Sequence, residues 1–138
     1  MKKVLIVNAN YYKDISSSLI ISAQKILDKS KIQSYIINVP GIFEIPVSIS
    51  KYIKKYDGFI ALGCVIKGET PHFDFICRSS FDAIMKLSID FHKPIGNGII
   101  TSLNMAQAIK RSSSTKSNKG VESANAVVSV LENEPKKI

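Results

Sequence analysis

The stretch "DGFIALGCVI" (Asp57–Ile66) decides the fold of this chain. Its apolar residues are continuous rather than alternating with polar ones, and an Asp-Gly turn precedes them. A run of this kind is typical of a β-strand that is buried on both faces, as in a parallel sheet covered by helices. The polar segment "KGETPHFDFIC" (Lys67–Cys77) follows and leads into a helical pattern.

Similar runs and helical patterns alternate along the rest of the chain. Three more strands are expected, at "KVLIVNAN" (Lys3–Asn10), "IQSYIINVP" (Ile32–Pro40) and "KPIGNGIIT" (Lys93–Thr101). Apolar positions at helical spacing predict helices between and after them, at Ile15 to Leu27, Pro46 to Tyr56, Phe73 to Phe91, Asn104 to Arg111 and Lys119 to Asn133. This alternation predicts an α/β fold in which a four-stranded parallel sheet lies between two layers of helices.

Length and composition indicate one ordinary domain spanning residues 1–138, with a frayed tail at 136–138. No apolar stretch approaches the roughly 20 residues that a membrane helix needs. The N-terminus runs straight into a strand pattern and lacks the cleavage site of a signal peptide. We therefore expect a cytoplasmic protein with no membrane contact.

The formal net charge of +8 raises the question of nucleic-acid binding. The lysines and arginines are dispersed along the chain rather than clustered, so we expect no nucleic-acid partner, and an anionic small substrate fits the sign of the charge. The two cysteines, Cys64 and Cys77, each lie inside an apolar pattern. Their spacing fits neither a disulfide framework nor a metal site, which predicts two buried thiols and no metal.

Ligands of open parallel sheets bind outside the carboxyl ends of the strands. That rule points to four segments, Asn8–Tyr12, Val39–Pro46, Cys64–His72 and Asn97–Thr101. In the third segment, Gly68 allows a turn, Thr70 suits a helix N-cap and Pro71 suits the first helical position. The free amides of such a helix start attract anions, and His72 beside them is a candidate for proton transfer. The alternative is a histidine that merely caps the helix.

The loop "VPGIFEIP" (Val39–Pro46) places an aromatic residue, Phe43, beside a carboxylate, Glu44. This pairing suits a flat heterocycle, which stacks on the ring while its N–H groups donate to the acid. Tyr11 and Tyr12 follow the first strand and can stack on the same ligand. The alternatives are a tight structural loop with a solvated acid, and two ordinary loop tyrosines.

Four blocks of this sequence, "VPGIFEIP", "ALGCVIKGETPHFDFIC", "NGIIT" and "AIKRSSSTKSNKG", resemble the signature blocks of the lumazine synthase family in order and spacing. The resemblance covers residues 3–132. It implies a flavodoxin-like three-layer fold and a cofactor-free condensation of a ribitylamino-uracil with 3,4-dihydroxy-2-butanone 4-phosphate, the penultimate step of riboflavin biosynthesis. It also implies a homo-oligomer, pentameric or larger, with active sites between adjacent subunits.

The resemblance assigns roles to individual residues. The pyrimidine would contact the following residues: Tyr11, Ile42, Phe43, Glu44, Cys64, Val65 and Ile66. Glu69 and Thr70 would form the phosphate-binding turn, and His72 would be the proton donor. A neighbouring subunit would supply Asn97, Arg111 (for the phosphate) and Lys119.

The chain departs from the family pattern in three places. Tyr12 occupies a position that is usually asparagine, Asn97 one that is commonly phenylalanine, and "RSSSTKSNKG" has serines where glycines are usual. The N-terminus begins two residues before the first strand, so we expect a pentamer rather than a sixty-subunit shell. Two alternatives to the enzyme stay open. One is an inactive relative that serves as a structural or ligand-binding assembly, and the other is a flavodoxin-like protein that binds a nucleotide or phosphosugar.

Overall fold

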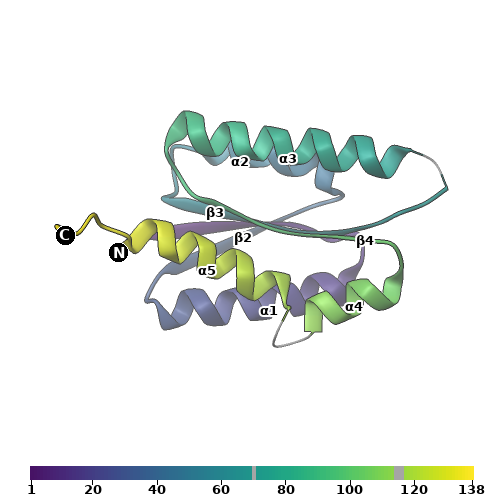
Figure 1. The fold of residues 1–138 in the computed structure, drawn as a ribbon, viewed down its shortest axis with the longest axis horizontal. Helices are drawn as coiled ribbons and strands as arrows, with labels where there is room; N and C mark the ends of the chain where they lie inside the picture. The colour runs from purple at the N-terminus through teal and green to yellow at the C-terminus, as the bar shows by residue number, and fades with distance from the viewer. Residues whose placement is uncertain (70, 114–116) are drawn as a thin grey trace.

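The computed structural model describes residues 1–69, 71–113 and 117–138. Four strands form one parallel sheet, namely β1 (Lys3–Ala9), β2 (Gln33–Val39), β3 (Gly58–Ile66) and β4 (Ile95–Ser102). Helices α2 (Ile45–Tyr52) and α3 (His72–Phe91) cover one face of the sheet. Helices α1 (Lys13–Lys29), α4 (Met105–Ser113) and α5 (Lys119–Glu132) cover the other face (Figure 1). The predicted three-layer α/β sandwich is confirmed.

The strands lie in the order β2-β1-β3-β4. The chain therefore moves outward in one direction from β1 to β2 and in the opposite direction from β3 to β4. The reversal leaves a crevice at the carboxyl ends of β1 and β3, where the connections diverge toward opposite faces. This is where the fold provides room for a ligand.

The central strands are apolar throughout because they contribute to two cores. Val4 and Ile6 of β1 face the core under α1, α4 and α5, whereas Leu5 and Val7 face the core under α2 and α3. All four are essentially inaccessible to solvent. Burying a side chain of this size stabilises the fold by about 1.5–3 kcal/mol, so apolar residues are favoured on both faces of the strand. Strand β2, at the edge, is largely exposed instead.

Two local predictions are wrong, and a third is not tested. Helix α2 ends at Tyr52 rather than Tyr56, and a 3-10 helix, η1 (Ile42–Glu44), precedes it. Helix α3 begins at His72 and not at Pro71, which is its N-cap and accepts backbone hydrogen bonds from Asp74 (3.1 Å) and Phe75 (3.3 Å). The predicted capping residue, Thr70, lies outside the described residues.

Gly68 is not required by the local backbone. No described glycine has a positive φ, and a Cβ at Gly68 would meet nothing within 4 Å. The sequence marks Gly68 as a residue that allows a turn, but the backbone here does not use the conformational freedom of glycine. The open space beside Gly68 instead leaves the turn accessible from outside.

Gly96 of β4, by contrast, lies directly under α5. A Cβ at this position would stand 2.3 Å from the carbonyl oxygen of Ser123 and 2.9 Å from Cγ2 of Val127. Because a backbone carbonyl of a packed helix cannot yield easily, we expect Gly96→Ala to lower the free energy of unfolding by about 2 kcal/mol or more. Urea unfolding at matched protein concentration measures this, with Gly68→Ala as the control expected to change little. A destabilisation no larger than that of the control would contradict the packing described here.

Two further observations concern the C-terminal residues and the length of the helices. Residues 133–138 follow α5 without secondary structure and are exposed. Within the described ranges, none of the helices combines the length and the apolar character needed to cross a bilayer.

Candidate active site

A cavity of about 630 Å³ opens at the carboxyl ends of β1 and β3. Four segments line it: the β1–α1 loop, η1, the end of β3 and the start of α3. Eight residues to which the family resemblance assigns a role line it: Tyr11, Ile42, Phe43, Glu44, Cys64, Val65, Ile66 and His72. Tyr12, the other stacking candidate from the sequence, lines it too. The structure thus brings together, in one cavity at the crevice that the strand order creates, the residues predicted to contact the pyrimidine and the predicted proton donor.

Two aromatic rings at the cavity are unusually open to solvent. Tyr11 is 75% exposed and Phe43 is 60% exposed, although both line the cavity. Large apolar rings in such a position offer flat surfaces on which a planar ligand can stack. Glu44 lies next to Phe43 in η1, with its backbone N–H donating to the carbonyl of Gly41 (3.2 Å). The short 3-10 turn therefore presents a ring and a carboxylate side by side.

The end of β3 forms the floor of the cavity. Register pairing with β1 stops at Leu62, whereas pairing with β4 continues to Ile66. Backbone N–H and C=O groups along this part of β3 that face away from β4 have no neighbouring strand, so they are available to hydrogen-bond a ligand. Burial raises the pKa of the Cys64 thiol to about 11, which keeps it neutral at physiological pH. Both cysteines are free and buried, as predicted.

The start of α3 meets the cavity from the other side. His72 is the first residue of this 20-residue helix, and its exposed side chain lines the cavity. The positive end of the helix, with its unpaired amides, therefore points at the same opening. Glu69 is exposed in the preceding turn and is not among the lining residues, and Thr70 lies outside the described residues.

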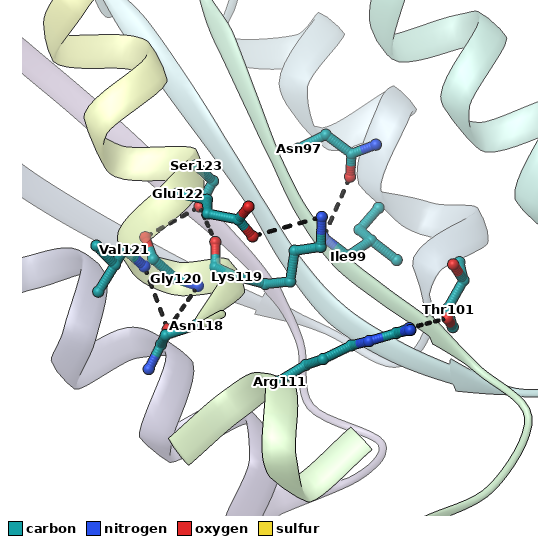
Figure 2. A network of polar contacts seen from close by, with 10 residues as sticks. All are labelled: Asn97, Ile99, Thr101, Arg111, Asn118, Lys119, Gly120, Val121, Glu122 and Ser123. Atoms are coloured by element: carbon teal, nitrogen blue, oxygen red, sulfur yellow. Dashed lines mark hydrogen bonds and ion pairs between the residues drawn. The ribbon is translucent and has the colours of Figure 1, made fainter. Parts of the chain in front are cut away.

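Three predicted site residues lie elsewhere, along the edge strand β4 (Figure 2). Arg111 donates from Nη1 to the Thr101 carbonyl at 2.7 Å, and Asn97 Oδ1 accepts from the Ile99 N–H at 3.1 Å. Lys119 Nζ lies 3.5 Å from a Glu122 carboxylate oxygen. None of Asn97, Arg111 and Lys119 lines the cavity described above. Apart from Glu69 and Thr70, the predicted site residues thus fall into two groups on one protomer. We call the eight lining residues the cavity group, and Asn97, Arg111 and Lys119 the β4-edge group.

Three lining residues, Ala9, Gly41 and Ile76, were not singled out individually from the sequence, although Ala9 and Gly41 lie within two of the predicted segments. Ile76 follows His72 by four residues on α3, so helical spacing from the histidine would have found it. Ala9 and Gly41 carry no chemistry of their own, and only their position beside the crevice marks them. Elsewhere in the described parts of the chain, no three His, Cys, Asp or Glu residues are grouped so as to hold a metal ion.

Comparison with known proteins gives a consistent result. The family model described as 6,7-dimethyl-8-ribityllumazine synthase matches residues 1–134. A protein of that name from Methylorubrum populi is 40% identical over 136 residues, covering 94% of this chain and 80% of the relative. One from Bartonella bacilliformis is 42% identical over 132 residues, covering 93% and 87%. A third, from Vesicomyosocius okutanii, is 39% identical over 140 residues, covering 94% and 84%.

Proposed function

This chain belongs to the 6,7-dimethyl-8-ribityllumazine synthase family, and we propose that its active site forms where the cavity group of one protomer meets the β4-edge group of another. The enzyme condenses 5-amino-6-(D-ribitylamino)uracil with 3,4-dihydroxy-2-butanone 4-phosphate. The products are 6,7-dimethyl-8-ribityllumazine, phosphate and two waters, and the reaction is the penultimate step of riboflavin biosynthesis. The observation that carries the site proposal is the convergence of eight predicted residues on one cavity.

The pyrimidine would bind between the exposed rings of Tyr11 and Phe43. Glu44 would accept hydrogen bonds from ring N–H groups, and the unpaired edge of β3 at Cys64–Ile66 would meet the polar atoms of the uracil. Ile42, which is buried, would support the ring of Phe43 from below. Stacking combined with a few directed hydrogen bonds is the usual way in which a protein holds a flat heterocycle.

The phosphate of the second substrate would bind at the start of α3. The backbone amides of Glu69, His72 and Phe73 would donate to it, because the Glu69 carboxylate itself would repel an anion and the amides of Asp74 and Phe75 already donate to Pro71. Thr70, the other residue assigned to this turn, lies outside the described residues. Arg111 of a neighbouring protomer would complete the site with a charge-assisted pair of hydrogen bonds. Asn97 and Lys119 of that protomer would contact the rest of the substrates.

The chemistry then requires proton transfers and charge stabilisation but no cofactor. The 5-amino group attacks the ketone, and the adduct loses water to form an imine. A proton leaves carbon 3 as the bond between carbon 4 and the phosphate oxygen breaks, and the resulting enol becomes a methyl ketone. The ribitylamino nitrogen attacks this ketone, and loss of the second water closes the ring. His72 would carry the protons, and the amides with Arg111 would stabilise the departing phosphate.

We further propose a homo-oligomer, of pentameric form, located in the cytoplasm. Helix α3 exposes three large apolar side chains, Phe75, Met85 and Ile89, each more than 60% accessible in the single chain. Surface patches of this kind on one protomer suit burial against another copy. Small phosphorylated substrates of a biosynthetic reaction fit a cytoplasmic location.

A mixing experiment tests the shared site directly. Neither His72→Gln nor Arg111→Ala protomers alone should form an intact site. In a 1:1 co-assembly, about a quarter of the sites should combine an intact His72 from one subunit with an intact Arg111 from the next, since each condition is met half the time. Lumazine absorbance measures the recovery, and differently tagged subunits with native mass spectrometry verify mixing. Mixed oligomers without recovered activity would show that the two groups do not act across an interface.

A further inference from the structure

The backbone at position 12 is tied to the start of α1. Tyr12 is the N-cap of α1, and its carbonyl accepts from the Ser16 N–H at 2.9 Å. The Ser16 hydroxyl in turn donates to the carbonyl of Ala9, at the end of β1, at 2.9 Å. Strand, cap and helix are thereby joined into one unit, so the point from which the Tyr12 side chain starts is well defined.

The side chain of Tyr12 is anchored as well. It packs against the core that includes Cys64, and burial raises the pKa of the phenol, with smaller contributions from Cys64 and Tyr11. Tyr12 therefore stays neutral. Its side chain lines the substrate cavity and is partly buried against the core. A second cavity, of about 540 Å³, lies on the side of α1 and α4, and Tyr11 and Tyr12 line both cavities.

Tyr11 has no comparable anchorage of its own. Its ring is 75% exposed, and its single aromatic contact within the described residues is with Tyr12. The two ring centroids are 4.9 Å apart with planes at 79°, an edge-to-face arrangement. Pairs of this geometry are favourable beyond the area they bury, so Tyr12 biases the exposed ring toward one orientation.

We propose that Tyr12 is a positioning residue, which holds the ring of Tyr11 at the wall between the two cavities in the orientation needed to stack on the pyrimidine. This rests on the proposed function, since it presumes that Tyr11 contacts the pyrimidine. Tyr12 acts through Tyr11, so its loss affects binding of the pyrimidine substrate and leaves the phosphate substrate and the proton transfers largely alone.

Three variants separate the ring from the hydroxyl and from general stability. Tyr12→Leu fills the core without an aromatic edge, and we expect the Kd and KM for the ribitylamino-uracil to rise roughly three- to tenfold. The kcat and the KM for the butanone phosphate should change less than twofold. Tyr12→Phe keeps the edge and should restore values within about twofold of the original. Tyr52→Leu, at a half-buried tyrosine on α2 away from both cavities, controls for lost packing.

The decisive measurement is a double-mutant cycle with Tyr11→Ala, using calorimetric binding of the ribitylamino-uracil and steady-state turnover in parallel. If Tyr12 acts through Tyr11, adding Tyr12→Leu to Tyr11→Ala should weaken binding no further. An equal loss with and without the Tyr11 ring would overturn the proposal, as would unchanged binding in Tyr12→Leu. A wild-type protein that binds the pyrimidine without turnover would count against the proposed function, while the cycle would still decide the role of Tyr12.

Discussion

Replacing His72 with glutamine is expected to lower kcat by roughly 10²-fold or more, the usual contribution of a positioned acid–base group. Glutamine keeps a polar side chain of similar size but cannot exchange a proton. His72 is exposed at the start of α3, so its loss should leave the fold and the affinity for both substrates nearly unchanged. Steady-state kinetics with each substrate varied in turn, followed by lumazine absorbance, measure the separation of kcat from KM.

The only other histidine of the chain provides the matched control. His92 is the C-cap of α3, at the opposite end of the same helix, with a left-handed backbone (φ 54°). Asparagine tolerates that conformation, so His92→Asn removes an imidazole without straining the cap. This variant should retain full kcat. If His72→Gln retained more than about half of the wild-type kcat, the proton-transfer role would belong to another group.

The layers of the fold could be predicted because the sequences of the central strands reflect burial on both faces. Both faces of β1 and β3 are buried, which requires continuous apolar runs that few other structures explain. The ends of the elements carried weaker signals. Proline favours the first helical position, yet Pro71 is the N-cap here, one residue earlier than expected, and η1 is too short to show a period. Local hydrogen bonds settle these boundaries, and such bonds leave little trace in composition.

The candidate site was predictable in part for a similar reason. Parallel strands bring their carboxyl ends to one edge, so Tyr11, Glu44 and His72 could be expected near one another before the order β2-β1-β3-β4 was known. The same rule placed Asn97 with that group, because its strand belongs to the same parallel sheet. The separation arises because β4 spans Ile95–Ser102, so Asn97 lies near its start and pairs with Ala61 rather than with the carboxyl end of β3. The expectation that Asn97 follows the end of its strand is therefore wrong.

Replacing Arg111 with alanine is expected to lower kcat/KM for the butanone phosphate by roughly 10²-fold, the scale of a lost pair of charge-assisted hydrogen bonds. The guanidinium is held in place by its own protomer, since Nη1 donates to the Thr101 carbonyl at 2.7 Å. Its remaining donors are therefore oriented before substrate arrives. The KM for the ribitylamino-uracil should change little, because that substrate carries no phosphate.

Two further substitutions separate geometry from charge in this prediction. Arg111→Lys keeps the positive charge but loses the planar fork, so it should recover only part of the activity. Lys110→Ala removes a neighbouring exposed charge from the same helix and should have little effect, since a protein with a net charge of +8 attracts anions with or without it. A fall in Lys110→Ala equal to that in Arg111→Ala would mean that Arg111 contributes through the overall charge of the surface. An equal rise in the KM for both substrates would instead place it away from the phosphate.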